Sequence, residues 1–401
     1  MNASINRRGF LKNVAAAASA SVMARATAQG TAANARVKAG VIGLGSRGSM
    51  IAGMVRGHDG YEVVAVADYF QEVADRAGEK LGVPNARRFS GLEGYRRLLD
   101  TDVEAVFLET PPYCFPEHVE AAVDAGRHVY MAKPIACDVP GALRVDAAAK
   151  KAKAGNKVFL VDFQMRTEPL VIEGIERIHG GEVGPIGLLS SIYTDEGFSD
   201  PPQTDTIESR LQHLVWVNDT ALGGGFLVNA GIHAVDVGLW LAGANPVAAM
   251  GSSRLIRGDP HGDTHDVYSL TYEFADGLAL NHQGEHVKNR FGFCCECSAY
   301  CRDGYLDTAY VGQVRILGNS AGWRGGEVEA LYTEGAKRNI AAFHQCVVNG
   351  NCTNGTVDPS INATLATILG REACERKTRV TWEQMLGENR RLEPNLAGLK
   401  A

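Results

Sequence analysis

The sequence predicts an α/β protein in which a doubly wound parallel sheet is followed by a second domain of the α+β type. Short apolar runs alternate with helix-like stretches from residue 36 onward, and a glycine-rich turn separates the first run from the first helix. The second half shows strand-like alternation with a hairpin signal at Asp276-Gly277. After a leader of about 30 residues, about 370 remain, and this length favours two domains.

The first domain is expected to consist of strand–helix units, because strand-like and helix-like runs alternate there. Such units pair their strands in parallel, since each crossover helix returns the chain to the same end of the sheet. The predicted strands are 37–45, 61–68, 103–110 and 128–133, and the predicted helices are 46–57, 71–82 and 116–126.

A glycine motif at the first turn predicts dinucleotide binding by a Rossmann domain. Gly43, Gly45 and Gly48 fit the pattern G-x-G-x-x-G. The first glycine permits the tight turn, the second lets a pyrophosphate approach the backbone, and the third lets helix and strand pack closely. The free N–H groups of the helix then face the phosphates. The predicted cofactor contacts in this turn are Gly43, Leu44, Gly45, Ser46, Arg47 and Gly48.

The end of the second strand indicates which nucleotide is bound. Asp68 lies twenty residues after Gly48, where a carboxylate accepts hydrogen bonds from the ribose hydroxyls of NAD. The same carboxylate repels a 2′-phosphate, and Tyr69 follows where an arginine would favour NADP. The sequence therefore favours NAD over NADP. The alternative is a glycine-rich turn followed by an exposed aspartate.

Further cofactor contacts are expected where other strands end, because open α/β sheets bind ligands at the carboxyl ends of their strands. The predicted contacts are Thr110, Pro111 and Pro112 after one strand, His118 in the helix that follows, and Lys133 at the end of the next strand. From its position alone, Lys133 is equally well explained as a solvated strand end.

An apolar helix in the second half carries a polar stripe. Asn229, His233, Asp236 and Trp240 recur at spacings of four, three and four, which places them on one face. A polar stripe on a buried helix must find partners or line a cavity. From the residues alone, a core histidine with a local hydrogen bond and a functional histidine are both open for His233.

Three stretches taken together resemble the Gfo/Idh/MocA oxidoreductases: "VIGLGSRG", "ETPPYCFPEHVEAAVDAGRHVYMAKP" and "GGGFLVNAGIHAVDVGLWL". The resemblance covers nearly the whole mature chain. It implies a Rossmann domain followed by a domain with a large open, mainly antiparallel sheet, which carries the substrate and often the oligomer interface. We therefore expect domains at 34–160 and 161–401 and a homo-oligomer, either a dimer or a tetramer.

The resemblance also implies the catalytic residues. The family's Glu-Lys-Pro motif falls on Ala132-Lys133-Pro134, and its Asp-x-x-x-His pair falls on Asn229 and His233. Alanine and asparagine replace the two acids, whereas Lys133 and His233 are retained. A histidine is suited to take a hydroxyl proton while a hydride leaves for the nicotinamide, and a lysine is suited to stabilise the alkoxide.

The predicted substrate contacts are Asn229 and Asp236 in this helix, together with Gln164 and Arg166, which correspond to family positions that face the sugar. Arg210, His213 and Trp216 precede the helix, and for these three a place in the cleft and a place on the surface are equally compatible with the sequence.

The predicted function is the NAD(P)-dependent oxidation of a CH–OH group in a sugar, a sugar derivative or a cyclitol. Two alternatives remain open. One is a redox-neutral NAD-dependent glycosidase, which oxidises, eliminates, adds water and reduces again. The other is a ligand-binding protein that kept the fold and lost catalysis, for which Ala132 and Asn229 are the favourable features.

Residues 1–33 are predicted to be a twin-arginine signal peptide. Arg7 and Arg8 precede an apolar run at 14–24 and two small-x-small cleavage sites within 24–28. We therefore expect export to the periplasm by the twin-arginine translocation machinery and no membrane association of the mature chain. Because that compartment has no free pool of NAD, the cofactor should be loaded beforehand, held tightly and recycled within each catalytic cycle.

Net charge and cysteine spacing argue against nucleic-acid binding and against a common zinc site. Forty Lys and Arg against 46 Asp and Glu give a net charge of −6 without a long basic run, so nucleic acid is not an expected partner. Four of the nine cysteines cluster at Cys294, Cys295, Cys297 and Cys301, without the Cys-x-x-Cys spacing of common zinc sites. We expect structural thiols or one disulfide, and no metal.

Overall fold

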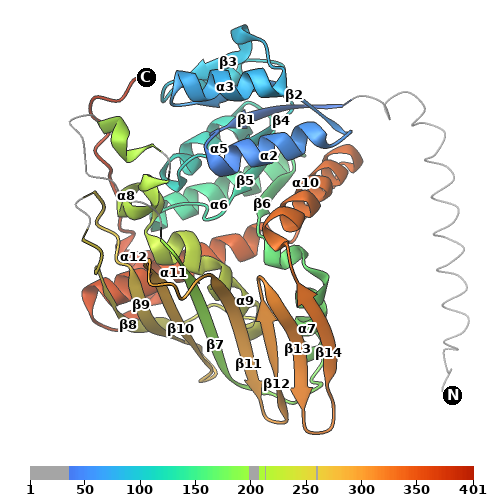
Figure 1. Cartoon of the computed structure of the whole chain (residues 1–401), viewed down its shortest axis with the longest axis vertical. Coiled ribbons are helices and arrows are strands. Elements are labelled where there is room, and N and C mark those ends of the chain that lie inside the picture. Colours follow the sequence, from blue (N-terminus) through green and yellow to red (C-terminus); the bar gives the residue numbers. More distant parts are fainter. Residues whose placement is uncertain (1–35, 198–206, 213, 259–260) are drawn as a thin grey trace, which may run out of the picture. The chain divides into compact units, whose positions relative to one another are not determined.

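The computed structural model describes residues 36–197, 207–212, 214–258 and 261–401, of which Lys38–Ala401 form one compact unit (Figure 1). The predicted signal peptide and His213 lie outside the described residues. The described chain contains a six-stranded and a nine-stranded sheet.

The six-stranded sheet confirms the predicted parallel architecture. Its strands are β1 (Val37–Ile42), β2 (Tyr61–Asp68), β3 (Arg88–Ser90), β4 (Ala105–Leu108), β5 (His128–Ala132) and β6 (Phe159–Asp162). Their order is β3-β2-β1-β4-β5-β6, so the order reverses between β1 and β4, which is where doubly wound sheets bind ligands. The predicted boundary after residue 160 falls inside β6.

Helices connect these strands, and local signals fix several of their ends. The helices are α2 (Ser46–Gly57), α3 (Gln71–Leu81), α4 (Gly94–Leu99), α5 (Phe115–Asp124) and α6 (Val139–Ala154). Helix α3 ends at Leu81 and is capped by Gly82, whose φ of 76° suits glycine. Helix α6 begins after Asp138, whose carboxylate accepts a hydrogen bond from the Gly141 N–H at 2.8 Å.

The nine-stranded sheet forms the second half and is mainly antiparallel, as the resemblance implies. Its strands are β7 (Ile186–Asp195), β8 (Ala248–Arg254), β9 (Val267–Glu273), β10 (Ala279–His286), β11 (Cys294–Cys301), β12 (Gly304–Ala309), β13 (Gly312–Gly318), β14 (Trp323–Val328) and β15 (Val380–Thr381). The order is β14-β13-β12-β11-β7-β10-β9-β8-β15, and among the described strands of this sheet only the β10–β7 pair is parallel. The predicted hairpin at Asp276-Gly277 joins β9 to β10.

Helices cover one face of this sheet, and the last long helices join the two halves (Figure 1). The second half contains α7 (Pro169–His179), α8 (Thr220–Gly223), α9 (Ile232–Ala242), α10 (Leu331–Asn349), α11 (Val357–Arg376) and α12 (Trp382–Glu388). Helix α10 returns to α2 and β6, and α11 packs against α6, α9 and β8. The two C-terminal helices therefore pack against elements of both halves.

The apolar helix predicted around His233 is a core element. The helical stretch Thr220–Ala242 is long and apolar enough to cross a membrane, but 83% of its most apolar window is buried inside the protein. A π-helical turn at Leu227–Gly231 precedes α9, and π turns are frequent at functional sites.

The cysteine cluster lies on β11. Cys295 and Cys297 are buried on the face toward the helices, and Cys294 lies on the other face, as the alternation predicts. Cys301 is partly exposed at the end of the strand, where the register shifts beside Tyr300. All nine cysteines are free thiols.

Candidate functional site

A cavity of about 1000 Å³ opens at the point where the order of the first sheet reverses, and residues of both halves line it. All the predicted cofactor contacts line it: Gly43, Leu44, Gly45, Ser46, Arg47, Gly48, Asp68, Thr110, Pro111, Pro112, His118 and Lys133. Of the other predicted site residues, Asn229, His233 and Gln164 also line it. Most of the site residues predicted from the sequence therefore lie together in the folded chain.

The glycine turn between β1 and α2 forms the floor of the cavity. Gly43 has a φ of 90°, and a side chain at Gly48 would lie 2.0 Å from the carbonyl oxygen of Gly43. A Cβ at Gly45 would meet nothing within 4 Å, so the backbone is open to the cavity there. Helix α2 starts after Gly45 without a capping side chain, which leaves its first N–H groups for an anion.

Asp68 ties this turn to the end of β2. Its carboxylate accepts hydrogen bonds from the Leu44 N–H at 2.7 Å and from the Phe70 N–H at 3.0 Å. Burial raises the pKa of Asp68, and the two N–H groups oppose this shift because they stabilise the charged form. The carboxylate therefore has its own protein partners. We call the part of the cavity around Asp68 the adenosine end.

A C-terminal tail, residues 392–400, lies along the adenosine end. The Lys400 N–H donates to the Tyr69 hydroxyl at 3.0 Å, and the Lys400 carbonyl accepts from the Leu92 N–H at 2.9 Å. Leu396 and Leu399 line the cavity between these contacts and the Leu392 N–H, which donates to Asp138 at 2.8 Å. The tail was not predicted, because its sequence carries no periodic signal.

The wall next to Asp68 is formed by the residues that follow β4. The Thr110 hydroxyl and His118 Nδ1 are 3.3 Å apart, and the His118 ring lies 4.2 Å from the Tyr95 ring between centroids. Burial lowers the pKa of His118 to about 4, so the ring is neutral at pH 7. A neutral ring leaves this wall without a positive charge and allows it to pack on a nucleoside.

Lys133 and His233 face the same cavity at its opposite end, which we call the reaction end. Lys133 follows β5, and its ammonium donates a hydrogen bond to the carbonyl of Asn229 in the π turn. Burial lowers the pKa of Lys133 to about 7, with Arg47 acting in the same direction and Asp162 and Glu109 opposing it.

His233 is enclosed by aromatic rings from three elements. The ring centroids of Tyr310, Phe163 and Tyr193 lie 5.4, 6.0 and 6.4 Å from it. Burial and then Lys133 hold the pKa of His233 well below its usual range, so the imidazole is neutral at pH 7. Its Nδ1 is buried without a hydrogen-bond partner within the described part of the chain. The local hydrogen bond that would explain a purely structural histidine is therefore missing at this nitrogen.

Two predicted substrate contacts pair with each other instead of lining the cavity. Arg166 donates two hydrogen bonds to the Asp236 carboxylate, both of 2.8 Å, and its guanidinium group lies over the Trp240 ring. Asp236 and Trp240, the C-terminal part of the polar stripe, thus have a protein partner in Arg166. A substrate role for Arg166 and Asp236 stays a prediction that this geometry does not support. Arg210 pairs with Asp219, whereas Trp216 lines the cavity.

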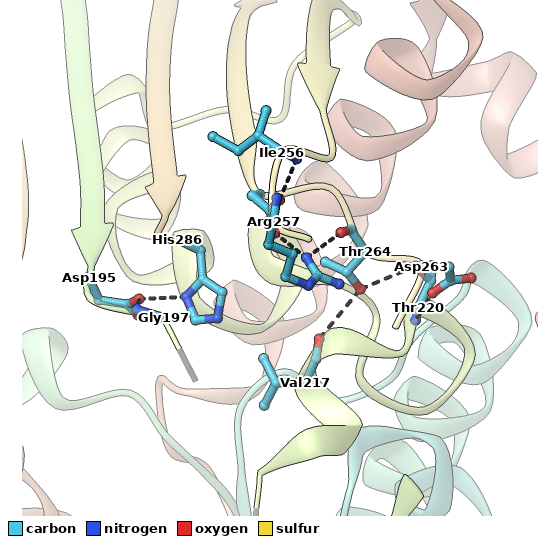
Figure 2. A network of polar contacts seen from close by, with 10 residues as sticks. Asp195, Gly197, Val217, Thr220, Ile256, Arg257, Asp263, Thr264 and His286 are labelled. Atoms are coloured by element: carbon cyan, nitrogen blue, oxygen red, sulfur yellow. Dashed lines mark hydrogen bonds and ion pairs between the residues drawn. The ribbon is translucent and has the colours of Figure 1, made fainter. Parts of the chain in front are cut away.

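Polar contacts surround Val217, which lines the cavity (Figure 2). Asp195 lines the cavity at the end of β7 and pairs with His286 at the end of β10. On the other side of the network, the Thr220 N–H donates to Asp263 at 2.8 Å. Arg257 donates to the Thr264 carbonyl at 2.7 Å within this loop, and the Thr264 N–H donates to the Asn218 carbonyl at 3.2 Å, so the loop is held against the segment that carries Trp216.

Sequence reasoning missed several cavity residues besides the tail. They include Glu109, Tyr193, Asp195, Phe293, Tyr310 and Tyr332. Glu109 had a detectable signal, since it is an acid that closes an apolar strand directly before the predicted contact Thr110. Tyr193, Phe293 and Tyr310 lie on or beside strands of the second sheet, and Tyr332 lies at the start of α10, so all four reach the cavity through long-range packing that the sequence does not specify.

The residues present fit a bound NAD. The open backbone at Gly45 and the start of α2 suit a pyrophosphate, and Asp68 with the neutral wall around His118 suits an adenosine. Lys133 and His233, at the other end, suit the nicotinamide and a substrate.

Two regions of the chain match one protein family. Residues 37–160 match the oxidoreductase family with an NAD-binding Rossmann fold, and residues 175–306 match the GFO/IDH/MocA C-terminal domain.

Similar curated proteins include two dehydrogenases. The NAD(+)-dependent scyllo-inositol 2-dehydrogenase of Bacillus subtilis (strain 168) is 25% identical over 249 residues, which are 61% of this chain and 66% of that protein. A 1-carboxy-3-chloro-3,4-dihydroxycyclohexa-1,5-diene dehydrogenase of Comamonas testosteroni is 32% identical over 181 residues, 45% of this chain and 41% of that protein. The chain thus spans less than two thirds of the length of both relatives.

Among solved structures, the fold is similar to that of the aldose-aldose oxidoreductase from Caulobacter crescentus in complex with glycerol. The TM-score is 0.71 at 21% identity, over 86% of this chain and 100% of that chain. With both domains matched in order and the same two-domain fold observed, the chain belongs to the Gfo/Idh/MocA family of oxidoreductases.

Proposed function

We propose that this protein is an NAD-dependent oxidoreductase that oxidises a CH–OH group of a sugar, a sugar derivative or a cyclitol, and that it retains and recycles its cofactor. One observation carries the proposal. Lys133 and a neutral His233 face the same cavity as the glycine turn and Asp68. The cavity therefore combines a dinucleotide cradle with an acid–base pair.

The roles of the residues follow from their charges. A neutral imidazole at His233 accepts the proton of the substrate hydroxyl, and the ammonium of Lys133 stabilises the oxygen on which negative charge develops. Bound NAD supplies the acceptor for the hydride. Asn229 lies one helical turn before His233 and orients the hydroxyl, but as an amide it gives the imidazolium no charge stabilisation.

The substrate class rests on the residues around His233 and on the relatives. Tyr193 and Tyr310 offer flat apolar faces beside His233, which suit the C–H face of a saturated ring, while Gln164 and Asn229 offer amides for its hydroxyls. The curated relative in Bacillus subtilis acts on scyllo-inositol, which is such a ring.

Retention of the cofactor is supported by the tail. Residues 392–400 cross the adenosine end and are attached on both sides, at Asp138 and at Tyr69. A dinucleotide held under this segment would leave only after the tail moves. This supports export with the cofactor in place, through the twin-arginine signal proposed for residues 1–33, to the periplasm.

A homo-oligomer is also part of the proposal. The nine-stranded sheet has helices on one face, whereas its other face remains partly exposed at residues such as Glu296 and Tyr300. A second copy of the chain would cover this face. Analytical ultracentrifugation of the mature protein measures the state directly, and a strictly monomeric sedimentation coefficient at micromolar concentration would remove this part of the proposal.

The first experiment identifies the bound nucleotide. We would purify the mature protein without added cofactor, denature it, and determine the released nucleotide and its redox state by mass spectrometry. We expect stoichiometric NAD or NADH. Protein that is empty and also fails to bind added NAD in calorimetry would contradict the proposal and favour a ligand-binding protein.

The second experiment tests the reaction with scyllo-inositol, myo-inositol and D-glucose as probes. We expect at least one of them to reduce the bound cofactor, and a carbonyl compound to reoxidise it. The Lys133→Met variant is the matched control, because it keeps the glycine turn and Asp68. Release of nitrophenol from a chromogenic glycoside without net reduction would instead favour the redox-neutral glycosidase. A fusion of residues 1–33 to a reporter measures export separately.

A further inference from the structure

Two acids flank Ala132 where strands β4, β5 and β6 end at the carboxyl side of the first sheet. Strands β4 and β5 pair Leu108 with Met131, so Glu109 and Ala132 occupy the next position of the same register. Strands β5 and β6 pair Ala132 with Asp162. Glu109, Ala132 and Asp162 therefore form one row, and Lys133 directly follows its middle member.

Asp162 is fully engaged by neighbouring groups. It accepts a hydrogen bond from the Asn339 amide at 2.7 Å and forms an ion pair with the guanidinium group of Arg47. Arg47 also reaches Glu109, with 3.5 Å between Nε and Oε2, so it spans the row from one acid to the other across Ala132. The methyl group at position 132 leaves this space to Arg47.

Glu109 is buried and lacks hydrogen bonds. Its side chain is 1% exposed, and neither of its carboxyl oxygens has a hydrogen-bond partner in the described part of the chain. Buried carboxyl groups are nearly always hydrogen-bonded in native proteins, so an exception at a cavity wall points to a functional constraint. Glu109 also lines the cavity.

The groups that face Glu109 are Arg47 from α2, Asp162 from β6 and Lys133 after β5. Asp162 and Glu109 both favour the ammonium of Lys133, and Asp162 acts more strongly, but Asp162 is also held by Asn339 and Arg47, whereas Glu109 has no hydrogen bond among the described residues. Burial raises the pKa of Glu109 to about 8, while Arg47 and Lys133 oppose this shift.

We propose that Glu109 is a positioning residue of the reaction end, whose carboxyl group is coupled electrostatically to Lys133 and fixes Arg47 above Ala132. The acid that the family's Glu-Lys-Pro motif carries at position 132 would thus stand at position 109 on the neighbouring strand. The inference rests on the proposed function for its catalytic meaning, but the electrostatic coupling of the two residues can be measured in the cofactor-free protein.

The direct test is the titration of Lys133. In protein with ¹³C-labelled lysine, the Lys133 Cε signal is assigned by its absence from Lys133→Met and followed against pH by NMR. We expect Glu109→Gln to move the midpoint of Lys133 to lower pH, because the neutral amide no longer favours the ammonium. Glu104→Gln, at the opposite and exposed end of the strand region, is the matched control and should leave the midpoint unchanged.

A rescue variant tests the transposed acid. Glu109→Gln combined with Ala132→Glu restores a carboxylate beside Lys133, and we expect it to return the midpoint toward that of the wild type. An unchanged Lys133 midpoint in folded Glu109→Gln would overturn the proposal. If Glu109→Gln does not fold, the ¹³C-carboxyl titration of Glu109 is compared between the wild type and Lys133→Met. Loss of the ammonium should move it to higher pH, and an unchanged midpoint there overturns the proposal equally.

Activity gives the second readout. With the probe that reduces the cofactor of the wild type, Glu109→Gln should lower kcat/KM about tenfold above pH 8, where the wild-type carboxyl group is ionised, and this loss is smaller than that on removal of an acid–base group itself. The loss should grow with pH, because uncharged Lys133 becomes more abundant, and the KM for NAD should change little. If the wild type neither binds NAD nor reacts, the proposed function fails, while the Lys133 titration still decides the role of Glu109.

Discussion

The two ends of the cavity satisfy their polar groups in different ways. At the adenosine end, both carboxyl oxygens of Asp68 accept backbone hydrogen bonds. At the reaction end, Glu109 and His233 Nδ1 are buried without hydrogen-bond partners among the residues described by the structure. Each such group costs about 1–3 kcal/mol of stability. At the adenosine end, the Asp68 carboxylate is therefore hydrogen-bonded without a ligand. At the reaction end, Glu109 and His233 lower the stability of the protein but leave polar atoms that a ligand can bind.

The largest effects are expected from Lys133→Met and His233→Asn. Either variant should lower kcat/KM about a thousandfold, because it removes an acid–base or charge-stabilising group. The melting temperature of Lys133→Met should stay the same or rise, since a buried ammonium is replaced by an apolar side chain of similar length. Kinetics with the reactive probe sugar and thermal unfolding of the same samples measure both. If Lys133→Met were less stable than the wild type and fully active, Lys133 would serve stability and not catalysis, contrary to what we expect of the reaction end.

Two glycines of one turn separate binding from stability. Gly45→Ala adds a methyl group where no protein atom lies within 4 Å, so the fold should be unaffected while NAD affinity drops at least about tenfold. Gly48→Ala places its Cβ 2.0 Å from the Gly43 carbonyl oxygen and should destabilise the domain by about 3 kcal/mol or more. Calorimetric titration with NAD and denaturant unfolding distinguish the two. Equal stability losses in both variants would mean that the turn is not open at Gly45.

A smaller effect is expected at the tail. Leu396→Ala combined with Leu399→Ala removes the apolar contacts at the adenosine end and should speed the release of bound NAD about tenfold, without changing the rate of hydride transfer. Lys400→Ala is the matched control, because Lys400 contacts Tyr69 and Leu92 through its backbone. Release is followed by rapid dilution into a nucleotide-scavenging enzyme. Identical rates in the double variant and the control would show that the tail does not retain the cofactor.

Local sequence signals were sufficient for the adenosine end. The spacing of Gly43, Gly45 and Gly48 and the place of Asp68 at a strand end are set within one strand–helix–strand unit, and the structure has them where this unit requires. The tail is the exception, because its contacts join residues about 300 positions apart in the chain, as with Lys400 and Tyr69.

The reaction end depends on pairings that the sequence does not encode locally. Glu109 reaches the neighbourhood of Lys133 through the register of β4 against β5, and this register is fixed only when the sheet assembles. Arg166 and Asp236 were expected to contact the substrate but form an ion pair with each other across 70 positions. Polar residues on a predicted helix face therefore identify groups that need partners, without saying whether the partner is protein or ligand.

The smallest predicted effect concerns stability against pH at the reaction end. In the folded protein the pKa of Glu109 is raised to about 8, whereas its ordinary value is 4.5. Between these pH values the folded state binds a proton that the unfolded state does not, so this group makes the protein less stable as the pH rises. Glu109→Gln cannot titrate, and its melting temperature relative to the wild type should therefore increase from pH 5 to pH 8.

Lys133 acts in the opposite sense and in a different window. Its pKa is lowered to about 7 from 10.5, so between these values the unfolded state binds the extra proton and stability rises with pH. Comparing melting temperatures of cofactor-free wild type, Glu109→Gln and the control Glu104→Gln below pH 7 therefore isolates Glu109. A constant difference between wild type and Glu109→Gln across this range would mean that Glu109 titrates as it does in water. The reaction end would then be hydrated, and the contrast with the self-sufficient adenosine end would disappear.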